Sequence, residues 1–377
     1  MPPSAQPESV LTPAPEGEKS LGVSSVTLWG GVVLITVVAI GAWAYWSGAL
    51  EGAPAQDAPK TIGMISISQV KEGDIAFKDE MARLGYADTV FLERLVISGP
   101  ALGKDTEAAV REFVAADVDL IWVSLENMAK IAVDITSELG RTDVPIVFIT
   151  RLHDPVEFGI IDSFQSSGNN STGVATNLLE IIQRHLEFLK AINPNIKKLG
   201  MFGEGFVVPP VGGAFFAEVK KLAPRFGIEV VEFKTSLPPP QAKAEFERIA
   251  AGIKKGDIDA IIHIAGHYYE TQEAGESELA IRLGIPMVTN YEDIPRGGHF
   301  TYSDGTAGSG RQSAVIADKI FKGAKPADIP IEYSANNFLS LHLARARAAG
   351  VVFPDAMLFI AEKKYEDDSQ FPSFEDH

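Results

Sequence analysis

The 377-residue sequence contains no cysteine. This absence excludes disulfide bonds, thiolate metal sites, a cysteine nucleophile and an anchor attached through a lipidated cysteine. Basic residues are also scarce: 33 Lys and Arg stand against 50 Asp and Glu, which gives a formal net charge of −17. Because contact with phosphates requires Lys and Arg, this balance argues against nucleic acid as a partner. A Gly-x-Ser-x-Gly nucleophile elbow is absent too.

The first 60 residues differ in composition from the rest of the chain. Residues 1–25 are rich in Pro, Ser, Ala and Glu without apolar periodicity, which predicts disorder. Residues 26–46 form an uncharged apolar run of about the length that spans a bilayer, with Trp and Tyr near its ends. A cleavable signal peptide is the alternative, but the start of the chain is not basic. The sequence therefore predicts one transmembrane anchor, followed by a linker over residues 47–60.

From residue 61 onward, strand patterns and helix patterns alternate. Strands are predicted at residues 61–67, 90–97 and 119–123, with helices between and after them. A second series of the same kind follows residue 178. This order predicts an α/β protein with two Rossmann-like lobes, each built on a parallel, doubly wound sheet. The predicted division gives residues 61–175 and 291–330 to lobe 1, residues 176–290 and 331–365 to lobe 2, and residues 366–377 to a tail.

Residues 144–177 present the ends of two predicted strands close together in sequence. Residues 144–149 read as a buried strand that runs directly into a polar loop, residues 150–154. A Gly/Ser/Asn-rich segment follows over residues 166–172 and leads into a second short strand. Ligands bind beyond the carboxyl ends of strands in open parallel sheets. An ordinary polar connection between a strand and a helix remains the alternative here.

The same stretch resembles solute-binding proteins of bacterial ABC importers, in the family related to tryptophan-binding proteins. The resemblance rests on Asp154-Pro155-Val156, Gly159, Gly168-Asn169 and Thr172-Gly173-Val174, and further on the run ADKIFKGAKPADIP at residues 317–330, on residues 338–343, and on residues 348–351 and 353–355. It covers residues 61–361. It implies a type I periplasmic-binding fold, with two lobes joined by three crossings. It also implies capture of a ligand by closure of the lobes, and no chemistry.

Two motifs that suggest other chemistry are incomplete. Residues 305–312, GTAGSGRQ, look like a phosphate-binding loop, but Arg311-Gln312 stand where that loop requires Lys followed by Ser or Thr. The sequence predicts a flexible turn that opens a helix at residue 311. His263 and His267 are four residues apart, but the first lies in a predicted strand. Their spacing therefore does not place two imidazoles on one helical face, and no metal site is predicted.

Polar and aromatic residues follow the predicted strands in both lobes. Together they would line one edge of both sheets, and they would suit an amino acid or a similar small zwitterion. Arg151 is predicted to pair with a ligand carboxylate, and Glu204 with an ammonium group. The predicted ligand-binding residues are Ser68, Gln69, Ser124, Glu126, Asn127, Thr150, Arg151 and His153 in the first lobe, and Glu204, Phe206, His267, Tyr268, Asn290 and Tyr291 in the second.

These features predict a membrane-anchored, extracytoplasmic solute-binding protein of an ABC importer. Its expected partners are a small polar ligand, held in a cleft between the lobes, and the ABC permease in the membrane. No cofactor and no nucleic acid are expected. A ligand-sensing ectodomain that signals to a membrane partner is the alternative function, because it shares the fold. An enzyme is a third class, for which the sequence offers no clustered nucleophile and base.

Overall fold

The computed structural model describes residues 59–67, 72–96, 101–204, 213–235, 241–263, 269–289, 294, 297–303, 305–335 and 337–370. The segment predicted to be disordered, the predicted anchor at residues 26–46 and the linker up to residue 58 lie outside these ranges. Within the described ranges, no helix is long and apolar enough to cross a membrane.

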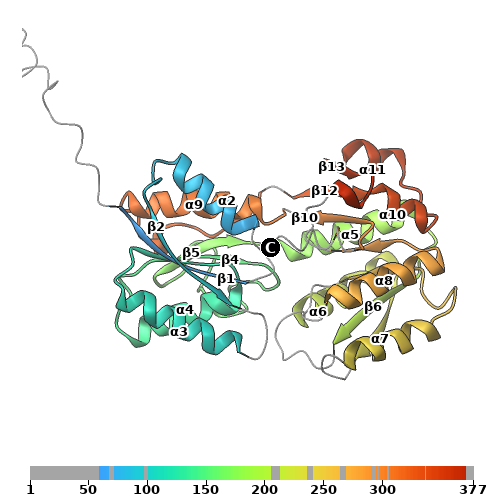
Figure 1. The fold of residues 1–377 in the computed structure, drawn as a ribbon, viewed down its shortest axis with the longest axis horizontal. Helices are drawn as coiled ribbons and strands as arrows, with labels where there is room; N and C mark the ends of the chain where they lie inside the picture. The colour runs from blue at the N-terminus through green and yellow to red at the C-terminus, as the bar shows by residue number, and fades with distance from the viewer. Residues whose placement is uncertain are drawn as a thin grey trace, which may run out of the picture. The chain divides into compact units, whose positions relative to one another are not determined.

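The first lobe is built on a six-stranded sheet in which all neighbouring strands are parallel (Figure 1). Helices α2 (Glu72–Arg83) and α9 (Ala307–Phe321) cover one face of it, and α3 (Leu102–Ala115) and α4 (Glu126–Glu138) cover the other. In spatial order the strands are β11 (Glu332–Tyr333), β5 (Ser171–Ala175), β4 (Ile146–Thr150), β3 (Leu120–Val123), β1 (Thr61–Ile67) and β2 (Val90–Val96).

Strand β3 shows why the sheet needs helices on both faces. Leu120 and Trp122 pack into the core under α2 and α9, whereas Ile121 and Val123 pack into the core under α3 and α4. A strand with apolar side chains on both faces is stable only between two helix layers, which is the arrangement of a doubly wound sheet. The α/β fold class predicted from the sequence is confirmed in this lobe.

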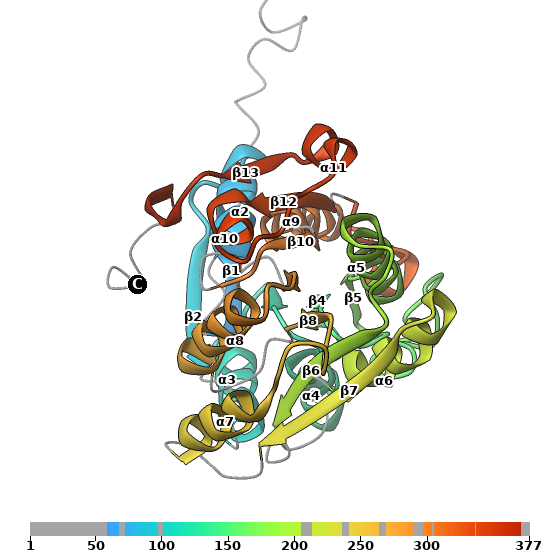
Figure 2. The same ribbon diagram turned by 90° about the vertical axis from the view of Figure 1, so that its right-hand side faces the viewer.

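The second lobe is built on a seven-stranded sheet. Helices α7 (Gln241–Gly252) and α8 (Tyr269–Leu283) pack on one face of it, and α5 (Leu178–Ile192), α6 (Gly213–Leu222), α10 (Leu343–Ala348) and α11 (Asp355–Ile360) pack on the other (Figure 2). In spatial order the strands are β13 (Lys363–Tyr365), β12 (Phe338–His342), β10 (Phe300–Ser303), β9 (Met287–Val288), β8 (Ala260–Ile262), β6 (Lys198–Glu204) and β7 (Glu229–Thr235).

The second sheet departs from the parallel arrangement at one edge. Strand β12 runs antiparallel to β10, with Phe338 opposite Ser303, the last residue of β10. The short segment 334–337 joins β11 of the first sheet to β12 of the second. The chain therefore enters the second sheet where its parallel strands end, and has to run in the opposite direction. The prediction of a wholly parallel second sheet is wrong at this edge.

The chain passes from one sheet to the other after β5, after β10 and after β11. Strand β10 pairs in the second sheet, although the predicted division gives it to lobe 1. Strand β11 pairs with β5 in the first sheet, although the same division gives it to lobe 2. Sequence patterns mark the strands, but the sheet that a strand joins depends on long-range pairing.

Glycines allow α2 and α9 to approach closely. A Cβ added to Gly310 would lie 2.2 Å from the carbonyl oxygen of Gly73, so no larger residue fits there without a backbone shift. Helix α9 already begins at Ala307, and the sequence-based start at residue 311 is therefore too late. Its glycines are part of a helix packed against its neighbour, not a flexible turn.

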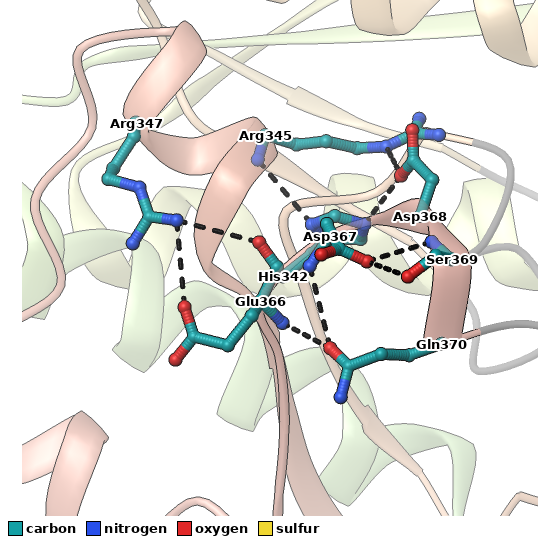
Figure 3. Close-up of polar contacts among 8 residues, drawn as sticks. All are labelled: His342, Arg345, Arg347, Glu366, Asp367, Asp368, Ser369 and Gln370. Carbon is teal, nitrogen blue, oxygen red and sulfur yellow. Dashed lines mark hydrogen bonds and ion pairs between the residues drawn. The ribbon is translucent and has the colours of Figure 1, made fainter.

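The end of the described chain is fastened to the second lobe (Figure 3). The Asp368 carboxylate accepts a hydrogen bond of 2.9 Å from Nε of Arg345, and lies 2.8 Å from Nε2 of His342. Burial lowers the pKa of His342, and Nδ1 of its ring accepts the backbone N–H of Arg345 at 3.4 Å, which leaves Nε2 as the donor to the carboxylate. Residues 366–370 of the predicted tail thus belong to the lobe, while residues 371–377 lie outside the described chain.

Candidate functional site at the carboxyl edge of the first sheet

Polar side chains gather where three neighbouring strands of the first sheet end. Strands β1, β3 and β4 are adjacent, and Ser66, Ser124 and Thr150 stand at or just beyond their carboxyl ends, all buried. Because the strands are parallel, these residues share one edge, the edge at which open α/β sheets bind ligands. The predicted ligand-binding residues that the structure places along this edge are Ser124, Glu126, Asn127, Thr150, Arg151 and His153.

Glu126 holds the loop that follows β4. It is 1% exposed, at the start of α4. Its Oε2 accepts the backbone N–H of Arg151 at 2.9 Å, and its Oε1 accepts that of Leu152 at 3.3 Å and lies 2.7 Å from Nδ1 of His153. A buried carboxylate is tolerated when such partners meet its hydrogen-bonding capacity. Glu126 therefore fixes the loop backbone, and with it the point from which the Arg151 side chain extends.

The motifs that carry the family resemblance fasten this region internally. The Asp154 side chain accepts the backbone N–H two residues further on, at 2.8 Å. The Thr172 hydroxyl donates to the carbonyl of Ile329 at 2.9 Å, which joins the two motif-bearing segments. A Cβ on Gly173 would lie 2.1 Å from the Phe148 carbonyl oxygen. These positions need their residue types for folding, so they do not themselves indicate ligand contacts.

Several buried oxygens at this edge have no hydrogen-bond partner within the described part of the chain. They are Oδ1 of Asp74, Oγ of Ser124, Oδ1 of Asn127 and Oγ1 of Thr150. Leaving one such group unpaired costs about 1–3 kcal/mol. Buried polar groups in native proteins are nearly always paired, with protein or with ordered water, so each of these oxygens needs a partner. Water or a polar ligand is able to supply it.

Asp74 is buried beside this group of polar residues, although it was not among the predicted ligand-binding residues. It lies in the first turn of α2, just beyond β1, and is 7% exposed. Burial raises the pKa of Asp74 to about 6, although a hydrogen bond with the Ser66 side chain and the charges of Lys78 and Arg151 all favour the ionised form. In sequence, Asp74 reads as a polar position of an amphipathic helix. The available signal was an acidic residue in the first turn of the helix that follows β1.

The second sheet also carries buried polar residues where its strands end. His263 follows β8, and its Nδ1 lies 2.9 Å from Oε2 of Glu276 on α8, with both side chains buried. Thr289 follows β9, and Ser303 ends β10; both hydroxyls are buried and find no partner in the described structure. His263, considered above only as half of a metal motif, thus belongs to a buried His–Glu pair.

The remaining predicted site residues stay predictions. Glu204 is the last residue of β6, but its side chain falls outside the described structure. The others outside it are Ser68, Gln69, Phe206, His267, Tyr268, Asn290 and Tyr291. Within the described ranges, no group of three or more His, Asp or Glu side chains is arranged to hold a metal ion.

Two α/β lobes on mainly parallel sheets, joined by three crossings of the chain, have the type I periplasmic-binding fold. The sequence model for ABC transporter substrate binding proteins matches residues 77–365, and the chain belongs to that family. Members of the family bind substrates for ABC transporters and are not enzymes.

The chain is similar to known proteins in part of its sequence and in its fold. A tyrosine-binding protein of Clostridioides difficile is 32% identical over 96 residues, a match that spans 26% of each chain. A Streptococcus pneumoniae domain in complex with L-Trp has a TM-score of 0.66 at 18% identity, covering 81% of this chain and 100% of that one. A substrate-binding protein with adhesive properties from Clostridium difficile, in a ligand-free, open structure, has a TM-score of 0.64 at 18% identity and the same coverage.

Proposed function

We propose that this chain is the membrane-anchored, extracytoplasmic solute-binding component of an ABC importer. Its ligand would be an amino acid, held in a cleft between the carboxyl edges of the two sheets and delivered to the permease in the membrane. Membership of the substrate-binding family supports the transport role. Relatives whose names mention tyrosine or L-Trp make the aromatic amino acids the first ligands to test.

The observation that carries the proposal is the group of buried, unpartnered oxygens at the edge of the first sheet. Hydroxyl and amide oxygens suit a ligand that offers hydrogen-bond donors, and the Arg151 guanidinium suits a carboxylate. A zwitterion meets both requirements. The predicted ligand contacts in the second lobe, Glu204 among them, would complete the site from the other sheet.

The ligand test begins with protein purified gently from its native host. Extraction and mass spectrometry would identify a retained small molecule, and calorimetric titration of the stripped protein would measure its affinity. Small-angle scattering should then show compaction on addition of ligand, because contacts to both lobes form only in a closed state. Tight binding with an unchanged radius of gyration would contradict closure and favour a pocket within one lobe.

The membrane anchor rests on the composition of residues 26–46. Full-length protein is expected in the membrane fraction of cells, and a variant that begins at Pro59 in the soluble fraction. Sequencing of the mature N-terminus supplies the control. An N-terminus generated after Ala44 or Ala55 would mean cleavage and would remove the anchor from the proposal.

A further inference from the structure

Asp74 differs from the other acidic residues of α2 because its carboxylate is buried and one of its oxygens has no partner among the described residues. Asp79 is exposed on the same helix, and Glu80 pairs with Arg83. Asp74 is 7% exposed, and its Oδ1 has no partner among the described residues. An ionised carboxylate in that environment is costly, and proteins retain such groups chiefly at functional sites.

The helix itself does not require a buried acid. Acidic residues near a helix N-terminus interact favourably with the helix dipole, but an exposed acidic residue already obtains this stabilisation. Glu72 already occupies the first turn of α2 and is exposed. Burial raises the pKa of Asp74, so its surroundings in the folded protein oppose the charge on balance. A purely structural role leaves this unfavourable environment unexplained.

The neighbours of Asp74 fit a ligand that carries a positive charge. Side-chain alternation places Ser66 and Ser124 on the sheet face that α2 covers, because Met64 and Trp122, two positions earlier on β1 and β3, pack into the core beneath α2. Ser66 bonds the Asp74 carboxylate. The Ser124 hydroxyl has no partner in the described structure, so it is able to accept a hydrogen bond from the same positively charged group that Asp74 would bind.

Arg151 supplies the complementary charge. Its positive charge acts on Asp74, and Glu126 anchors the backbone from which its side chain extends. A carboxylate and a guanidinium at the same edge of the sheet match the ammonium and carboxylate groups that an amino acid carries on its α-carbon.

We propose that Asp74 receives the ammonium group of the amino-acid ligand, with the Ser124 hydroxyl as a further acceptor, and thereby selects ligands that carry a free primary amine. This inference rests on the proposed function and names the residue responsible for one part of its specificity. It assigns the ammonium group to Asp74 of the first lobe, in place of Glu204 of the second lobe, the ammonium partner expected from the sequence.

The test compares full-length wild-type protein in detergent with Asp74→Asn, which keeps the shape and removes the charge. Asp79→Asn is the matched control, because it removes an exposed carboxylate from the same helix. Thermal shift with each of the twenty L-amino acids selects the best ligand for wild type. Calorimetry then compares that ligand with its desamino analogue; for tyrosine this is 3-(4-hydroxyphenyl)propionate.

Asp74→Asn should weaken binding of the amino acid by about tenfold to a hundredfold, the effect of removing one charged partner of a buried ion pair. Binding of the desamino analogue should change little, and Asp79→Asn should bind both ligands as wild type does. Equal losses for the two ligands, or unchanged amino-acid binding, would overturn the role of Asp74. A large loss in Glu204→Gln alone would assign the ammonium group to the second lobe. If none of the twenty amino acids stabilises wild type, the proposed ligand class itself fails, before any variant is compared.

Discussion

The indole N–H of Trp122 donates a hydrogen bond of 3.0 Å to the hydroxyl of Ser313, and the bond is fully buried between β3 and α9. Ser313 in turn donates to the carbonyl of Gly310 at 2.7 Å. These residues belong to chain segments on either side of the second lobe in sequence. The bond therefore fastens a late helix of the first lobe to a strand formed much earlier in the chain.

Ser313→Ala should destabilise the first lobe. The substitution leaves the Trp122 N–H buried without an acceptor, which costs about 1–3 kcal/mol. A lower melting temperature and a lower denaturation midpoint should report the loss. In the double variant, Trp122→Phe should reduce stability by less than Trp122→Phe does in the wild type, since it removes an indole N–H that Ser313→Ala has already left without an acceptor. Independent, additive losses would mean that the hydrogen bond contributes little.

Gly310→Ala should be more damaging than an ordinary helix substitution. The new methyl group would meet the Gly73 backbone at 2.2 Å, so α2 and α9 would have to separate. Overpacking of this kind costs about 1–3 kcal/mol or more. Gly252→Ala is the control: that glycine is also helical, and its added Cβ has no neighbour within 4 Å. A loss of stability confined to Gly310→Ala, seen by thermal melting, is the expected result.

Stability should fall as pH rises through the range in which Asp74 ionises. Its pKa is about 6 in the folded protein and 3.8 in the reference state. Between these values the folded chain keeps a proton that the unfolded chain has lost, so the free energy of unfolding decreases with rising pH. Removing the carboxyl group as Asp74→Asn should therefore raise stability at pH 7, by up to about 3 kcal/mol at 1.36 kcal/mol per pKa unit.

The gain should fall to about 0.5 kcal/mol at pH 4, just above the reference pKa, and towards zero at lower pH, where the carboxyl group is protonated in both the folded and the unfolded chain. Melting curves of wild type and Asp74→Asn at pH 4, 5, 6 and 7, without ligand, measure the difference. A variant less stable than wild type at pH 7 would show that the interactions which favour the ionised Asp74, namely the Ser66 hydrogen bond and the charges of Lys78 and Arg151, outweigh the cost of burying the charge.

Arg151→Ala should weaken binding of a ligand carboxylate by about tenfold to a hundredfold, since charge-assisted hydrogen bonds contribute about 1.5–3 kcal/mol. Arg151→Lys should recover only part of the affinity, because an ammonium group lacks the planar two-point contact. Arg225→Ala, which removes an exposed arginine from the second lobe, is the control. Calorimetry and melting curves on the same samples decide: an unchanged affinity with a lower melting temperature would make Arg151 a structural partner of Asp74.

Local sequence patterns predicted most elements of the fold. The bounds of β1 agree with the predicted range 61–67, and α5 begins at residue 178, where the second series of elements was predicted to start, because an apolar strand and an amphipathic helix leave clear periodicities. The start of α9 was predicted too late, since its glycines are explained only by contact with α2. The sheet membership of β10 and β11 was wrong for a similar reason, because it depends on partners far away in sequence.

The site was predictable to a lesser degree. The rule that ligands bind beyond strand ends led to Ser124, Thr150 and the loop that carries Arg151. It did not reveal that the Glu126 carboxylate is engaged with loop backbone, or that Asp74 is buried. Both facts follow from how α2 and α4 pack on the sheet, and a polar residue in a helix looks the same in sequence whether it faces solvent or the interior.

The position of β11 and α9 in the chain affects how the protein is made. Both belong to the first lobe, yet the ribosome synthesises them only after β6–β10 of the second lobe. Until residues 307–333 have emerged, the nascent first lobe lacks one edge strand and one of the two helices that cover Met64 and Trp122. That apolar face is then covered by α2 alone while the second lobe is translated, and partly exposed apolar surface of this kind makes a nascent chain prone to aggregation.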